Sequence, residues 1–187
     1  SLCSSVIAQT SLSYQKNAPV KGSSFTTFEF VYVEPGAGGP DQIWDFSNIV
    51  FTSKNQTSLT YAQAKEILPD ISGFNLVSSE DGYEYYYTVK ENKTELLGYA
   101  GQGLSLVYTD PVTKMKYPFL YGDKFSDDFS GYGIYNKSAS RVDFSGQYTV
   151  TADAYGRLIL PDRTVKNALR IRIHKTAEEN HTCSKID

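Results

Sequence analysis

The sequence is short of the side chains that most often carry catalysis and metal binding. Its 187 residues include two histidines, two cysteines and one methionine. Histidine is the usual acid-base group near neutral pH and, with cysteine, a frequent ligand of transition metals. The histidines, His174 and His181, are not accompanied by a G-x-S-x-G turn, so the sequence predicts no serine-hydrolase triad. We therefore expect a protein that is not an enzyme.

Positive charge and long apolar runs are lacking as well. The formal net charge is -3 and charged residues make up 21% of the chain, so no basic field exists to gather the phosphates of a nucleic acid. No run approaches the roughly 20 apolar residues that a membrane-spanning helix needs. We expect neither a nucleic-acid partner nor a transmembrane segment.

Aromatic residues and glycine are abundant, and they favour strands joined by turns. The chain has 15 tyrosines, 10 phenylalanines and 14 glycines. Turn-forming pairs such as Asp81-Gly82, Asp110-Pro111 and Pro161-Asp162 recur at short intervals. This pattern predicts an all-β protein, a single-domain antiparallel β-sandwich of the jelly-roll or immunoglobulin-like type.

Individual segments fit this prediction. Residues 23–33 alternate in polarity as a strand does, residues 34–41 form a turn rich in glycine and proline, and residues 43–50 resume the strand pattern. One short helix is expected at residues 60–68, where Thr60 can cap a run of helix-forming side chains.

The first residues are small, apolar and uncharged, which is typical of the end of a signal peptide. We expect residues 1–8 to be its remnant, with cleavage after Ala8, residues 9–175 to form the domain, and residues 176–187 to form a polar tail or linker. Cys3 and Cys183 lie near opposite ends of the chain, and their spacing leaves open whether they pair.

Four short segments carry a resemblance to a known family. They are, in order, residues 17–20 (Asn-Ala-Pro-Val) with Gly22, residues 43–47 (Ile-Trp-Asp-Phe-Ser) after the glycine-rich turn, residues 117–122 (Tyr-Pro-Phe-Leu-Tyr-Gly) with Asp127 and Phe129, and residues 154–161 leading to residues 168–171 (Ala-Leu-Arg-Ile). The chain resembles secreted proteins of the Bacteroidetes that often end in a type IX secretion sorting domain. The resemblance implies a β-rich module that is secreted or held on the outer surface of a bacterium, and it supplies no catalytic residues.

Tyrosines cluster in one predicted strand. Tyr83, Tyr85 and Tyr87 share a face, and a row of aromatic rings is one way in which a sheet binds sugars. Packing of these rings in the core is the favoured interpretation, which would leave Tyr86 exposed on the other face. Trp44 is expected to anchor the core below the glycine-rich turn, with stacking on a ligand as the alternative.

Asp123, Asp127 and Asp128 form the densest group of carboxylates. Oxygen ligands on a loop can hold Ca²⁺ in extracellular modules, although capping of turns explains the same residues and is the favoured interpretation. No other cofactor is predicted.

The favoured function is a non-enzymatic binding or adhesion module at the cell surface, with a glycan or another surface protein as partner. Two alternatives remain open. The domain either assembles with copies of itself through an open sheet edge, or serves as an accessory domain of an exported enzyme. The sequence predicts neither the ligand nor the oligomeric state.

Overall fold

The computed structural model describes residues 10–62, 71–135 and 140–180, and these residues are mostly strand. The single helix among them, α1 (Tyr14–Asn17), is one turn long. The strands are β1 (Ser11–Leu12), β2 (Ser24–Phe30), β3 (Gly39–Asp45), β4 (Phe51–Ala62), β5 (Leu76–Glu80), β6 (Tyr83–Lys90), β7 (Lys93–Gly101), β8 (Leu104–Lys116), β9 (Phe119–Leu120), β10 (Lys124–Tyr135), β11 (Ser140–Ile159) and β12 (Thr164–Asn180). The all-β, sandwich-like prediction is confirmed.

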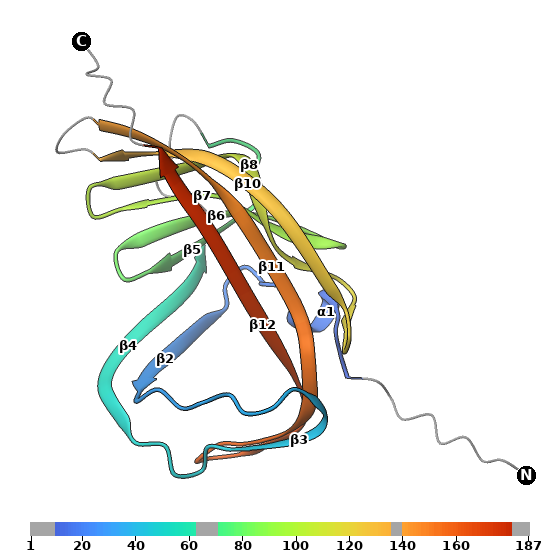
Figure 1. Ribbon diagram of the computed structural model, residues 1–187. Helices are drawn as coiled ribbons and strands as arrows, with labels where there is room; N and C mark the ends of the chain where they lie inside the picture. Colours follow the sequence, from blue (N-terminus) through green and yellow to red (C-terminus); the bar gives the residue numbers. More distant parts are fainter. Residues whose placement is uncertain (1–9, 63–70, 136–139, 181–187) are drawn as a thin grey trace, which may run out of the picture.

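One large sheet contains most of these strands (Figure 1). Its order is β12-β11-β10-β8-β7-β6-β5-β4-β2, with antiparallel neighbours throughout, as short turns between consecutive strands require. The sheet is mixed rather than purely antiparallel, because β3 pairs in parallel with the second half of β11. β1 and β9 form a separate two-stranded ladder.

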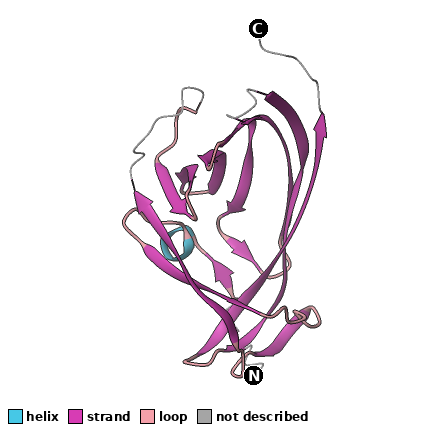
Figure 2. Cartoon of the chain, turned by 90° about the vertical axis from the view of Figure 1, so that its left-hand side faces the viewer, coloured by secondary structure: helices cyan, strands magenta, loops and turns pink. Residues whose placement is uncertain are grey.

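The large sheet curls so that distant strands face one another (Figure 2). Tyr85 and Tyr87 of β6 pack against the same buried cluster as Leu169 and Ile171 of β12. These strands are five places apart in the sheet order, which in a flat sheet is roughly 24 Å. The shared cluster therefore defines an inner face, and the sandwich-like shape arises from one curled sheet instead of two separate ones.

Aromatic rings fill the middle of this inner face. Tyr108, Phe129 and Phe144 lie with ring centroids 5.4 to 6.3 Å apart. They fit because Gly131 between them has no side chain: a Cβ there would fall against the carbonyl oxygen of Val107 and 2.7 Å from the Phe144 ring. Glycine in a strand often marks such a close approach.

The outer face carries a smaller cluster of Ile71, Val77, Tyr86 and Val107. The segment that precedes β5 covers it, and Phe74 of this segment packs edge-on against Tyr86 with ring centroids 5.2 Å apart. The middle of the sheet is thus buried on both faces.

Two predictions of local structure need correction. Residues 60–62, expected in a helix, belong to β4 and pair with residues 77–79 of β5, so sheet pairing overrides their helix propensity; the rest of that segment lies outside the described residues. Residues 176–180, expected in a polar tail, continue β12, and the polarity of residues 176–179 reflects their exposure at the sheet edge. The predicted cleavage site, Cys3 and Cys183 also lie outside the described residues.

We predict that Gly131→Ala destabilises the protein by about 1–3 kcal/mol, because the new methyl group overpacks the aromatic cluster. Gly133→Ala is the matched control in the same strand, since its Cβ would meet no atom closer than 3.8 Å. Urea denaturation followed by circular dichroism measures both variants. Equal free energies of unfolding for the two variants would contradict this account of the inner face.

Candidate functional site

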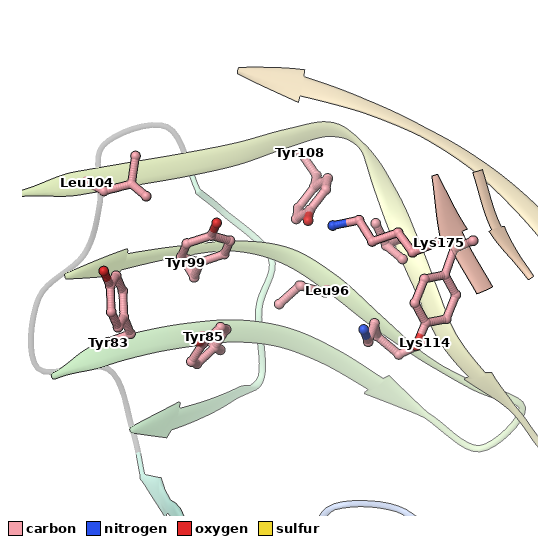
Figure 3. A pocket seen from close by; sticks show the side chains of 10 residues that line it. Tyr83, Tyr85, Leu96, Tyr99, Leu104, Tyr108, Lys114 and Lys175 are labelled. Atoms are coloured by element: carbon pink, nitrogen blue, oxygen red, sulfur yellow. The ribbon is translucent and has the colours of Figure 1, made fainter. Parts of the chain in front are cut away.

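A pocket of about 370 Å³ opens on the inner face of the curled sheet (Figure 3). Five tyrosines, two lysines and three aliphatic residues line it. They are Tyr83 and Tyr85 of β6, Leu96 and Tyr99 of β7, Leu104, Tyr108, Val112 and Lys114 of β8, Tyr148 of β11 and Lys175 of β12. The curl of the sheet is what brings β6 and β12 to opposite sides of one pocket.

Three of the tyrosines form one side of the pocket. Tyr83 and Tyr85 are two residues apart in β6 and share a face, and Tyr99 lies directly opposite Tyr85 in the antiparallel register of β7. Their ring centroids are 5.3 to 6.4 Å apart. All three side chains are half-buried, so each offers part of a flat ring to the pocket.

The other two tyrosines are buried. Tyr108 is 6% exposed and Tyr148 is 3% exposed. Burial raises the pKa of Tyr108 to about 12 and raises the pKa of Tyr148 as well. Both phenols are neutral at physiological pH and present hydroxyl groups that can donate or accept hydrogen bonds.

Two lysines reach in from the side opposite Tyr83, Tyr85 and Tyr99 (Figure 3). The Lys114 Nζ lies 4.2 Å from the centroid of the Tyr148 ring, and the Lys175 Nζ lies 5.1 Å from that of Phe129. Neither lysine forms an ion pair with another residue in the described part of the chain. Contact with aromatic faces compensates only partly for lost hydration.

The electrostatics of the two amines reflect this environment. Burial, and to a lesser degree the positive charge of Lys175, lowers the pKa of Lys114 to about 8. Lys175 is more exposed, and partial desolvation lowers its pKa too. The pocket therefore combines flat rings, neutral hydroxyl groups and cations that lack a carboxylate partner.

The predicted row of tyrosines divides between pocket and core. Tyr83 and Tyr85 line the pocket, whereas Tyr87 on the same face packs against the inner cluster. The expectation that Tyr86 is exposed is wrong, since it is 1% exposed and its hydroxyl donates to the Glu84 carboxylate at 3.0 Å. The reason is that the segment before β5 covers the outer face of β6.

Tyr99, Tyr108, Tyr148, Lys114 and Lys175 are site residues that the sequence did not reveal. Each lies in a strand whose alternation marks only which side chains share a face. The curl of the sheet decides which strands meet across the pocket. The alternation of polar and apolar residues along a strand does not predict this curl.

Trp44 lies outside this pocket and is half-buried. It lines an apolar groove of about 310 Å³ together with Leu158 and Leu169. Its Nε1 donates to the carbonyl oxygen of Pro35 at 3.2 Å, which ties it to the glycine-rich turn. Trp44 was expected to anchor the core below the glycine-rich turn, but it lines a groove and lies in neither buried cluster, because its indole N–H is bonded to the turn itself.

Arg170 fastens the same turn to the sheet. Its Nε and Nη2 donate to the two carboxylate oxygens of Asp153 at 2.8 and 3.0 Å, while Nη1 donates to the carbonyl oxygens of Pro35 and Gly36 at 2.6 and 3.1 Å. The guanidinium carbon lies 5.8 Å from the centroid of the Trp44 ring. A bidentate pair with this many partners is a structural clamp.

The three aspartates do not converge. Asp123 accepts from the Leu120 amide at 2.8 Å, Asp127 from the Thr113 amide at 2.7 Å, and Asp128 from the Gln147 side chain at 2.9 Å. Within residues 10–62, 71–135 and 140–180, no group of three or more His, Cys, Asp or Glu side chains is arranged to hold a metal ion. The divergence of the three carboxylates speaks against the calcium alternative, and Asp123 acts as a turn cap, in line with the favoured interpretation.

Comparison of the chain with protein-family models, with curated proteins and with solved structures finds no match. Among the described residues, no helix has the length and apolar character needed to cross a membrane.

We predict that Lys114 makes the protein more stable as pH rises from about 8 toward 10. The unfolded chain, with a lysine pKa near 10.5, holds a proton that the folded chain has lost in this window, so the free energy of unfolding rises by at most ~1.4 kcal/mol per pH unit. Above pH 10 the raised pKa of Tyr108 acts in the opposite direction, because only the unfolded chain then loses the phenol proton.

Lys114→Met should therefore be more stable than the wild type at pH 7 and gain less stability between pH 8 and 10. Urea denaturation at several pH values measures this. Lys124→Met, a change at an exposed lysine of β10, is the control and should keep the wild-type rise. The same pH dependence in Lys114→Met as in the wild type would refute the assignment.

Proposed function

We propose that this protein is a non-enzymatic, exported binding module whose tyrosine pocket holds a saccharide. The observation that carries the proposal is the half-buried cluster of Tyr83, Tyr85 and Tyr99 in a pocket on the inner face of the curled sheet. Its location, in the medium or on the outer surface of a bacterium, rests on the uncharged apolar start of the chain and on the resemblance to secreted Bacteroidetes proteins.

The chemistry of the pocket suits a sugar. A pyranose ring has apolar C–H faces that pack on aromatic rings, and hydroxyl groups at its edge that need hydrogen-bond partners. Tyrosine supplies both functions in one side chain, and the lysines add further donors. The volume of about 370 Å³ lies at the lower end of the ~300–1,000 Å³ that small-molecule sites occupy, which suits a short stretch of a saccharide.

A module of this kind serves equally in adhesion and as an accessory domain that holds an exported enzyme near its substrate. Both roles require the same pocket and differ only in what is attached to the module.

Self-assembly is the second candidate function, and the length of β12 favours it. This strand has 17 residues and forms one edge of the large sheet. Its exposed side chains include Lys166 and Arg172, and cationic side chains on an edge strand oppose pairing with another edge. The pocket therefore supports binding more strongly than the edge supports assembly.

We predict that Tyr85→Ala and Tyr99→Ala each weaken saccharide binding by at least about tenfold, the equivalent of ~1.4 kcal/mol. A panel of neutral and acidic oligosaccharides, titrated into the full chain by calorimetry, first identifies a ligand. Tyr32→Ala removes a tyrosine that is 75% exposed outside the pocket, and it should bind as the wild type does. Circular dichroism verifies that each variant is folded.

Tyr85→Phe keeps the ring and removes the hydroxyl, so it separates stacking from hydrogen bonding. Undiminished binding by both alanine variants would rule out this pocket as the site. Failure of every saccharide in the panel to bind would rule out the proposed function.

A further inference from the structure

We propose that the pocket selects saccharides that carry an anionic group, a carboxylate or a sulfate ester, and that Lys114 and Lys175 bind this group. The inference rests on the proposed function and specifies its ligand class.

The positions of the two lysines carry the argument. Lys114 lies on β8 and Lys175 on β12, and two strands separate these in the sheet order. The curl nevertheless places both amines in one pocket, close enough for the charge of Lys175 to act on Lys114. Two like charges held together in a partly dry site repel each other, and an anion between them relieves that repulsion.

No carboxylate in the lining of the pocket neutralises the two amines. None of the ten lining residues is acidic. Elsewhere in the described part of the chain, Lys93 is paired with Glu95, Arg141 with Asp143 and Arg170 with Asp153. The protein has a net charge of -3, so the pair in the pocket is a local feature and not part of a generally basic surface.

Acidic residues act instead on the tyrosine side of the pocket. Burial raises the pKa of Tyr85, and Glu80 and Asp81 add to this shift. Burial and the neighbouring tyrosines raise the pKa of Tyr99, with a smaller contribution from Glu179. Carboxylates are therefore close to the tyrosine side of the pocket, whereas the two amines lie on the other side. This polarity would orient an acidic sugar with its ring on Tyr85 and Tyr99 and its anionic group on the amines.

Matched pairs of polysaccharides test the inference. Dextran is compared with dextran sulfate, and methyl-esterified with de-esterified homogalacturonan, because each pair differs only in the anionic group. Affinities for the full chain are measured by calorimetry in 0.15 M and 0.5 M salt. We expect the acidic member of at least one pair to bind at least tenfold more tightly, with the sulfate or the carboxylate pair showing which group is recognised.

Variants of the two lysines test whether these side chains cause the preference for acidic saccharides. Lys114→Met and Lys175→Met should each lower the affinity for the acidic member by about tenfold more than the affinity for its neutral partner, so that the acidic preference is largely lost. Lys114→Arg and Lys175→Arg keep the charge and should retain most of the preference. Lys124→Met makes the same change in net charge at an exposed site and should have no effect. Lys175 is largely exposed, so its variants should fold even if those of Lys114 do not.

The outcomes separate the inference from the proposed function. Equal binding of neutral and acidic members overturns the inference but keeps the saccharide site. An acidic preference that Lys124→Met weakens as much as Lys175→Met does also overturns it, since the attraction is then unspecific. Binding of no polysaccharide in either salt overturns both.

Discussion

The curl of the large sheet is the constraint on which the pocket depends. Strands β6 and β12 are five places apart in hydrogen-bonding order, yet their side chains meet on one inner face. The curl is compatible with a dense aromatic filling because Gly131 leaves room beside Tyr108 and Phe144. A flatter sheet would keep every ladder hydrogen bond and lose the pocket, because β6 and β12, which contribute to its opposite sides, are not neighbours.

The pocket contains a charged side chain whose burial costs free energy, and packing alone does not explain why it is there. Lys114 is desolvated, lies beside a second cation and has only aromatic faces as compensation. An apolar side chain at this position would fill the same space without that cost. Natural proteins tolerate such local costs most often at functional sites, where the interaction that relieves the strain comes from the ligand. The clamp formed by Arg170 and Asp153 shows the contrast, since there the same kind of charge is fully satisfied within the chain.

The sequence predicted the strands well where alternation is local. The shared face of Tyr83, Tyr85 and Tyr87 is an example, because a strand fixes it without reference to anything else. Burial of Tyr86 depends on the segment before β5, and the strand state of residues 60–62 depends on pairing with β5. The pocket depends on register and curl together, so Tyr99 and the two lysines had no local signal. The calcium alternative for the three aspartates lacks support for a related reason, because nearness in sequence does not make carboxylates converge in space.

The most direct test of the account is a crystal structure of the full chain with a short acidic oligosaccharide. The account predicts a sugar ring stacked on Tyr85 and Tyr99, with its carboxylate or sulfate oxygens about 3 Å from the amines of Lys114 and Lys175. An oligosaccharide bound in the groove beside Trp44, or tyrosine rings that turn inward and fill the pocket, would contradict it.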